Sequence, residues 1–249
     1  MKRFLGACTL VMLMTGCATT SGTADPRDPF EGFNRTVFRF NDAVDQAVLK
    51  PVATGYQKVT PSFVQTGVSN FFGNIGDVWS TVNSLLQGQV EATLSSGMRV
   101  AINTTFGFLG VLDIASEAGL AKQKEDFGQT LGVWGVPSGP YLVLPILGPS
   151  TVRDTAALPV DFEGDVWQYA DPVSVRNAGT VLRIVDTRAS LLGAGNLLED
   201  VALDKYAFTR DAWLQRRQSQ IGGESSRPAY YDEFDEEDFE ESAQPAATQ

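Results

Sequence analysis

The chemistry open to this chain is limited first by the residues it lacks. It contains 249 residues, no histidine and 2 cysteines. Without histidine there is no Ser-His-Asp triad, no imidazole general base and almost no route to a catalytic zinc site. No phosphate-binding Walker loop or dinucleotide fingerprint is present either. We therefore expect no metal, no cofactor and no catalytic residues of these classes.

Carboxylates remain as candidate catalytic groups. Asp161, Glu163 and Asp165 follow one another beside Trp167 and Tyr169. Glycoside hydrolysis requires only two carboxyl groups about 5 to 10 Å apart. A carboxylate-based cell-wall glycosidase is therefore one hypothesis, although acidic residues are common throughout the chain.

Cys17 is the residue with the most specific chemistry. Residues 1–16 have two basic residues, an apolar core and a Thr-Gly end, which is typical of a secretory signal peptide, and Met14 to Cys17 resembles a lipobox. Cys17 then becomes the first mature residue and the site of lipid attachment, unless the signal is a plain one and the cysteine incidental. Several acyl chains, at roughly 0.8 kcal/mol per buried methylene, would hold the protein on a membrane.

The flanks of the body indicate a compartment and a charge distribution. Ala18 stands where an Asp would signal inner-membrane retention, so we expect the periplasmic face of a Gram-negative outer membrane, with residues 17–28 as a tether. From Glu224 onward nine acidic residues face only Arg227, within a whole-chain net charge of −11. Residues 222–249 are therefore predicted to be a disordered acidic tail, and nucleic acid is not an expected partner. Aromatic residues among the acids leave a scaffolding or docking role open.

Residues 29–221 are expected to form one mainly α-helical domain. Apolar residues recur at helical spacing over about 29–50, 60–71, 75–86, 90–106, 171–192 and 204–220, and no alternating strand pattern of any length appears. Asp28 and Pro29 predict the first helix start, and Lys50-Pro51 predicts its end. We expect each apolar stripe to face a core.

The segment 127–154 should carry irregular backbone because glycine and proline interrupt it repeatedly. It encloses a short apolar run that includes Tyr141, Leu142, Val143 and Leu144. This run is either a buried strand in a Gly/Pro-rich loop or a lip that faces lipid.

The helix at 171–192 carries Arg176 and Arg183 opposite an apolar side. Such a stripe suits an amphipathic surface, where the apolar side meets acyl chains or core and the arginines meet water or phosphate. An ordinary solvated face explains the same pattern.

Several of these segments together resemble a known family. They are 28–35 (DPFEGFNR), 127–132 (FGQTLG) leading to Gly139-Pro140-Tyr141, Pro145 through Gly148 to Arg153-Asp154, 186–189 (DTRA), and 204–206 (DKY). In this order, after a lipobox, they resemble the MlaA (VacJ) family of outer-membrane lipoproteins from about Asp28 to Gln220.

The resemblance implies a fold and a function. Members of the family are ring-shaped bundles of amphipathic helices beside a trimeric porin, and phospholipids misplaced in the outer leaflet pass through a channel to the periplasmic carrier MlaC. No covalent bond changes, so no enzyme is implied. Tyr141, Leu142, Val143, Leu144, Arg176 and Arg183 become candidate channel or lipid-facing residues. A structural scaffold lipoprotein is the alternative from another class.

Overall fold

The computed structural model describes residues 25–222, and the predicted signal peptide, Cys17 and the acidic tail lie outside them. The fold is mainly helical, as predicted, with one β-hairpin. The elements are α2 (Glu31–Val44), η2 (Asp45–Leu49), α3 (Lys50–Val59), α4 (Ser62–Leu86), α5 (Val90–Thr105), α6 (Ile114–Glu117), α7 (Phe127–Val133), β1 (Tyr141–Leu144), β2 (Gly148–Thr151), α8 (Val152–Gly164), η3 (Val166–Tyr169), α9 (Val173–Ser190), α10 (Leu192–Val201) and α11 (Lys205–Gly222). Within residues 25–222, no helix combines the length and apolarity that crossing a bilayer requires.

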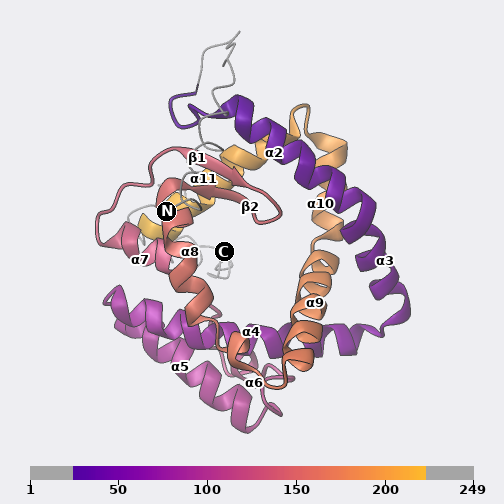
Figure 1. Ribbon diagram of the computed structural model, residues 1–249. Coiled ribbons are helices and arrows are strands. Elements are labelled where there is room, and N and C mark those ends of the chain that lie inside the picture. The colour runs from indigo at the N-terminus through magenta and orange to yellow at the C-terminus, as the bar shows by residue number, and fades with distance from the viewer. Residues whose placement is uncertain (1–24, 223–249) are drawn as a thin grey trace, which may run out of the picture.

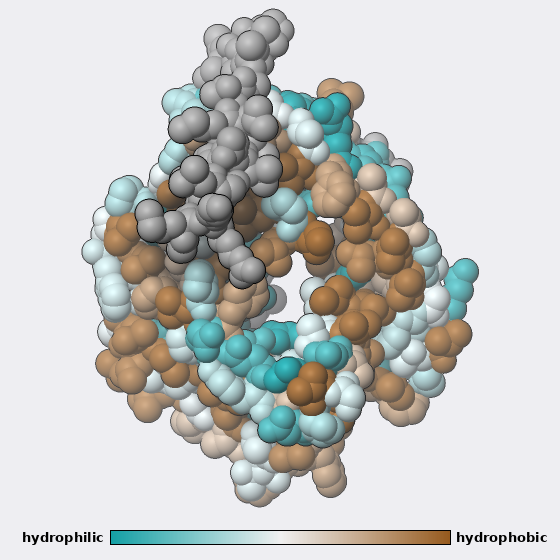
Figure 2. All heavy atoms as spheres, in the orientation of Figure 1, coloured by the Kyte–Doolittle hydropathy of each residue, from teal (hydrophilic) through white to brown (hydrophobic). Residues whose placement is uncertain are grey.

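The elements follow one another around a ring (Figure 1). Helices α2 and α3 form one side, α4 crosses below, and α7, α8 and the hairpin form the opposite side. Helix α9 then returns along α3, and α11 packs against α7 and β2. The space-filling view shows an opening through the centre of this ring (Figure 2).

The first helix does not end at Lys50-Pro51, contrary to the prediction. It continues from α2 into α3 through η2, a π-helical turn that ends at Leu49, two residues before Pro51. Proline cannot donate the hydrogen bond of a regular helix and its ring clashes with the preceding turn. A π-helical turn changes the local hydrogen-bond pattern and so accommodates Pro51 without a chain break.

Asp28 does not cap α2, which is a second correction. Helix α2 begins at Glu31 with no side-chain cap, and Asp28 is buried. Its carboxylate accepts hydrogen bonds from Asn34 Nδ2 at 2.8 Å, from the Tyr206 hydroxyl and from Arg210 at 3.3 Å. Asp28 therefore joins the first helix to the last and helps to close the ring.

The segment 127–154 contains two short antiparallel strands, with Tyr141 opposite Thr151 and Leu144 opposite Gly148. The alternative of a buried strand is thus the correct one for part of the apolar run. Asn34 fixes β1, because its side chain donates to Tyr141 O at 3.0 Å and accepts from Val143 N at 2.9 Å. The hairpin turn places Ile146 at φ 66°, a conformation that is uncommon for a β-branched residue.

The apolar stripes do not all face a core, which is the main correction to the sequence analysis. In α5 the expected core residues Leu94, Met98 and Phe106 are 61%, 51% and 68% exposed. The face of α5 that packs against α4 carries Ser96, Arg99 and Asn103 instead. Among the described residues, 18 polar or charged side chains are buried against 11 apolar ones, five of them alanine. The interior is therefore polar and much of the exterior is apolar, the reverse of an ordinary soluble domain.

Helix α4 is one continuous helix of 25 residues, although two shorter helices were predicted over the same stretch. Its buried positions include Asn74, Asp77, Ser80 and Asn83. These polar residues recur at helical spacing and form the inner face of the helix. The polar stripe, rather than the apolar one, positions α4 against its neighbours.

Candidate functional site

A cavity of about 730 Å³ lies inside the ring. It is bordered by α4, the loop 122–126, β2, α8, α9 and α11. Charged residues from all of these elements except β2 line it: Asp77, Lys122, Lys124, Glu125, Asp126, Asp154, Asp161, Asp165, Arg183, Asp186 and Arg217. A cavity with this lining can bind charged groups, and the next question is which of its charges already have partners.

Arg217 is the most heavily paired cation in this wall. Its guanidinium contacts Asp126 at 2.6 Å and Asp154 at 2.9 Å, and its side chain is 12% exposed. Asp126 also caps α7 through a hydrogen bond from Gln129 N at 2.9 Å, with the reciprocal bond of a capping box. Arg217 therefore ties α11 to α7 and α8 and belongs to the framework of the cavity.

Arg183 and Lys122 each contact one carboxylate of the wall. Arg183 Nη1 lies 2.6 Å from Asp165, and the two side chains are about one third exposed. Lys122 Nζ lies 3.1 Å from Asp77. The Arg183–Asp165 pair is partly exposed and contributes about 0–1 kcal/mol, so a charged ligand can exchange with it at low cost. In the second pair only Lys122 is exposed, because the Asp77 side chain is 3% exposed and also contacts Arg99.

Lys124 differs from these cations because, within residues 25–222, its ammonium group has no carboxylate in ion-pair range. The pKa of Lys124 is lowered, first because the cavity walls displace water and then because Arg183 and Arg216 repel the charged form. Burial likewise raises the pKa values of Glu125 and Asp161. The cavity thus holds a cation that gains from an incoming anion.

The cavity also has apolar wall residues. Phe72 and Trp79 of α4, Leu158 and Phe162 of α8, and Leu147 of the hairpin turn contribute to its lining. Figure 2 shows hydrophilic residues along the lower border of the opening and hydrophobic residues along its right border. One wall can therefore accept a charged group while another accepts hydrocarbon, which suits an amphiphile.

The two predicted arginines occupy different places. Arg183 lines the cavity, and its role as a lipid-facing residue stays a prediction. Arg176 instead donates to Gln168 O at 3.0 Å, while its own carbonyl accepts from Trp167 Nε1 at 3.1 Å. Arg176 therefore fastens η3 to α9 and is not among the residues that line the cavity.

The predicted apolar run is divided by the alternation of the strand. Tyr141 and Val143 are 0% and 1% exposed and pack with Val37 and Tyr206, so they serve as core. Leu142 and Leu144 are half-buried. Cys17 lies outside the described residues, and its role as lipid-attachment site stays a prediction.

Of the three candidate catalytic acids, Asp161 and Asp165 line the cavity and Glu163 does not, and each of the three has a structural partner. Asp161 accepts hydrogen bonds from Trp79 Nε1 and Phe127 N, both at 2.8 Å, and so holds α8 against α4 and α7. Asp165 caps η3 and pairs with Arg183. Glu163 is exposed and accepts a hydrogen bond from the Tyr169 hydroxyl at 3.1 Å. In each case these contacts give the acid a structural role that explains its position.

Sequence reasoning missed Lys124, Asp126 and Arg217. The charged run at 122–126 directly before the 127–132 motif was a signal for the first two, because a capping acid followed three residues later by glutamine marks a helix start. Nothing in the local pattern around Arg217 distinguishes it from Arg216. The role of Arg217 depends on its contacts with Asp154 and Asp126, which lie 63 and 91 positions earlier in the sequence.

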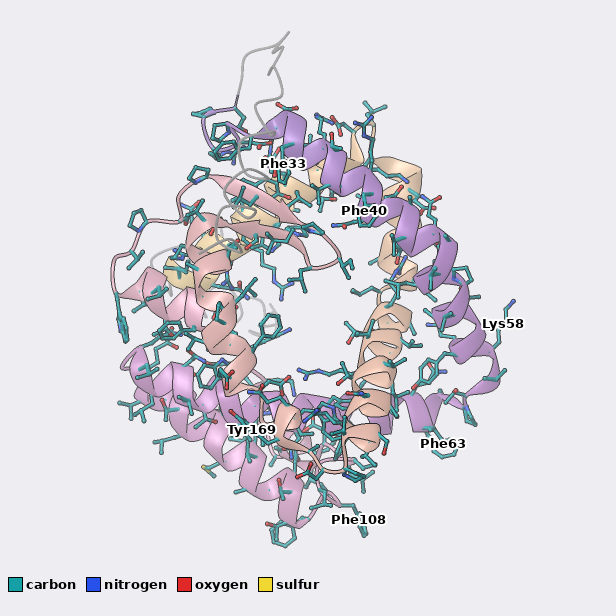
Figure 3. The ribbon with its side chains drawn as sticks, viewed as in Figure 1. Phe33, Phe40, Lys58, Phe63, Phe108 and Tyr169 are labelled. Atoms are coloured by element: carbon teal, nitrogen blue, oxygen red, sulfur yellow. The ribbon has the colours of Figure 1, made fainter. Side chains whose placement is uncertain are left out.

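The outer surface carries aromatic side chains. Phe33 and Phe40 lie on α2, and Phe63 and Phe108 extend from the ring edge away from the opening (Figure 3). Phe33, Phe40, Phe63 and Phe108 are 47%, 52%, 76% and 76% exposed, whereas the buried Phe72 is 7% exposed. Exposed apolar surface of this extent indicates contact with a membrane or another protein.

Comparison with known proteins gives consistent matches. The sequence profile described as MlaA lipoprotein matches residues 26–220. Two proteins named intermembrane phospholipid transport system lipoprotein MlaA are similar: that of Escherichia coli (strain K12) is 35% identical over 92% of both chains, and that of Haemophilus influenzae is 32% identical over 88% of this chain and 90% of the relative. A solved structure, from work on the structural basis for maintenance of bacterial outer membrane lipid asymmetry, superposes with a TM-score of 0.69 at 34% identity, covering 78% of this chain and 98% of the other.

Proposed function

Because this chain belongs to the MlaA lipoprotein family, we propose that it removes phospholipids from the outer leaflet of an outer membrane by letting them pass through the central cavity of its ring. The protein is a component of phospholipid transport, and the proposed passage makes and breaks no covalent bond. The acids of the cavity then serve the framework and the ligand path rather than catalysis.

The observation that carries the proposal is a cavity with charged and apolar walls inside a ring whose outer surface is apolar. Moving a charged headgroup through hydrocarbon costs several kcal/mol or more unless polar groups replace its water. Lys124, Arg183 and the carboxylates around them supply such groups. Phe72, Leu158 and Phe162 supply an apolar surface for the chains of the same molecule.

The apolar exterior supports a position within one leaflet of the membrane. Its aromatic residues suit the interface between headgroups and hydrocarbon. Attachment through acylated Cys17 would hold the ring at the periplasmic face of the outer membrane. A trimeric porin beside the ring and a periplasmic lipid carrier, MlaC, are the partners that we propose on the ground of the family.

The proposal is tested in cells that lack the gene, complemented with wild-type or variant protein. Outer-leaflet phosphatidylethanolamine is measured by labelling intact cells with an amine-reactive reagent that does not cross the membrane. We expect deletion to raise the labelled fraction and wild-type protein to restore it. An unchanged labelled fraction on deletion would instead favour the scaffold hypothesis.

A further inference from the structure

A second hollow lies between α4 and α9 and is separate from the central cavity. It has a volume of about 600 Å³ and is lined by apolar side chains and glycines of α4, α9, Val111 and Trp167. We call it the α4–α9 groove. The single polar side-chain atom of its lining, Trp167 Nε1, already donates to Arg176 O. The groove therefore suits hydrocarbon and offers nothing to a charged group.

Only a thin aromatic wall divides the groove from the central cavity. Phe72 lines both spaces and is 7% exposed. Its ring packs edge-to-face on Trp167 at 5.2 Å and on Phe71 at 5.2 Å, and Phe71 packs on Trp167 at 6.0 Å. Such contacts contribute about 0.5–1.5 kcal/mol each, so a small number of weak contacts holds this wall closed.

Helix α9 presents adjacent residues to the two spaces. Leu182 lines the groove and Arg183 lines the central cavity, where its guanidinium lies 5.9 Å from the centre of the Phe72 ring. Lys124 lines the same cavity as Arg183. A basic pair thus lies on one side of Phe72 and a hydrocarbon-sized space on the other.

We propose that the α4–α9 groove holds one acyl chain of the phospholipid whose phosphate binds at Lys124 and Arg183, with Phe72 and Trp167 as the movable wall between them. The inference rests on the proposed function and adds the place where one acyl chain of the transported phospholipid lies. The transported lipid is the favoured occupant rather than a bystander of the bilayer, because no residue that lines the groove is basic. Arg176 lies beside the groove, but its guanidinium already donates to Gln168 O. Lys124, on the cavity side, has no carboxylate within 4.0 Å among the described residues.

The test uses full-length protein in mild detergent with phosphatidylethanolamine that carries a photoactivatable diazirine in the middle of one acyl chain. After illumination, labelled peptides are identified by mass spectrometry. We expect label within 63–72 and 175–182. Ala178→Trp fills the groove from an exposed position and should lower this label roughly tenfold, whereas Asn177→Trp, on the adjacent exposed position outside the lining, should not. Thermal unfolding of both variants shows that they fold.

A second variant tests whether the acyl chain in the groove belongs to the lipid whose headgroup binds at Lys124. Lys124→Gln should lower groove labelling roughly tenfold, the effect of losing one charge-assisted hydrogen bond. Groove labelling that is unchanged in Lys124→Gln would mean an independent membrane lipid and would overturn the inference. Label confined to 147–162 would overturn it as well, while leaving passage through the central cavity intact. Absence of label from every peptide of the wild-type protein would count against the proposed function itself.

Discussion

Removal of Arg217 should open the ring at the joint between its last helix and its Gly/Pro-rich side. In Arg217→Ala, Asp126 and Asp154 lose the guanidinium that contacts them at 2.6 and 2.9 Å. Asp154 is 8% exposed at its side chain and keeps Arg153, at 2.9 Å, as its remaining cationic partner, whereas Asp126 loses the cation that contacts it. Breaking a buried pair from one side costs about 3–5 kcal/mol, and we take the lower end, about 3 kcal/mol, because Asp126 is 32% exposed and Arg153 still contacts Asp154.

For a domain of this size, that loss lowers Tm by roughly 6–12 °C. The assay is thermal unfolding in mild detergent, followed by circular dichroism. Arg216→Ala is the matched control, because Arg216 is exposed and has no ion pair with a carboxylate among residues 25–222. Adding Asp126→Asn to Arg217→Ala should restore part of the loss, because it removes the carboxylate that has lost its cation. A Tm within about 2 °C of the Arg216→Ala control would refute the reasoning.

Four further predictions follow from named contacts. Arg183→Glu places a second carboxylate beside Asp165 and should slow clearance of outer-leaflet phospholipid. Arg39→Glu, a charge reversal at an exposed residue outside the cavity lining, should leave clearance close to the wild-type rate, and equal effects of the two variants would contradict the assignment. Gly164→Ala places a methyl group 2.3 Å from the Trp79 ring and should cost about 2 kcal/mol, while Gly193→Ala meets nothing within 4 Å and should be neutral or slightly stabilising in denaturant titrations. Although burial opposes it, hydrogen bonds from Ser116, Asn103 and Arg99 hold the pKa of Asp113 below its ordinary value. This carboxylate therefore stabilises the fold above about pH 4, and its contribution is lost as pH falls through the lowered pKa. Asp113→Asn should be less stable than wild type at pH 7 and should lose less stability on acidification, and parallel curves of stability against pH for the two proteins would argue against this. Cys17→Ala should release the protein from the membrane fraction, and normal sedimentation with outer membranes would exclude acylation at this residue as the anchor.

Periodicity predicted the helices but not their surroundings. The stripe of Leu94, Met98 and Phe106 correctly identified a helix at 90–106, yet the stripe is exposed. A 3.6-residue repeat indicates that the two faces of a helix differ in polarity, but it does not indicate which face meets protein, water or lipid. The decisive signal was on the other face, where Ser96, Arg99 and Asn103 recur at the same spacing. Arg99 is 1% exposed and is neutralised by Asp113 at 2.9 Å, so its burial depends on partners that local sequence does not reveal.

The ring closure and the cavity could be predicted only in part for a related reason. Asp28 reads as a helix cap from its neighbours, but its partners Tyr206 and Arg210 lie 178 and 182 positions away. Arg176 and Arg183 share a predicted face, but the chain reversal at η3 gives Arg176 a carbonyl partner and leaves Arg183 in the cavity. Contacts of this range are fixed by the closed topology, and that topology entered the sequence analysis only through the family resemblance.

A ring with an open centre has no single apolar core to stabilise it, so its elements must be joined in another way. Between α4 and α5, Arg99 bridges Asp77 and Asp113; at the closure, Arg210 and Arg217 bridge α11 to the rest. Such pairs are weak in water and strengthen where water is excluded. If the apolar exterior is covered by lipid, the medium that excludes water from the outside also strengthens the joints inside. The polar interior that stabilises the ring and the polar wall that a headgroup needs are then one feature of the sequence, and selection for passage and for stability acts on the same residues.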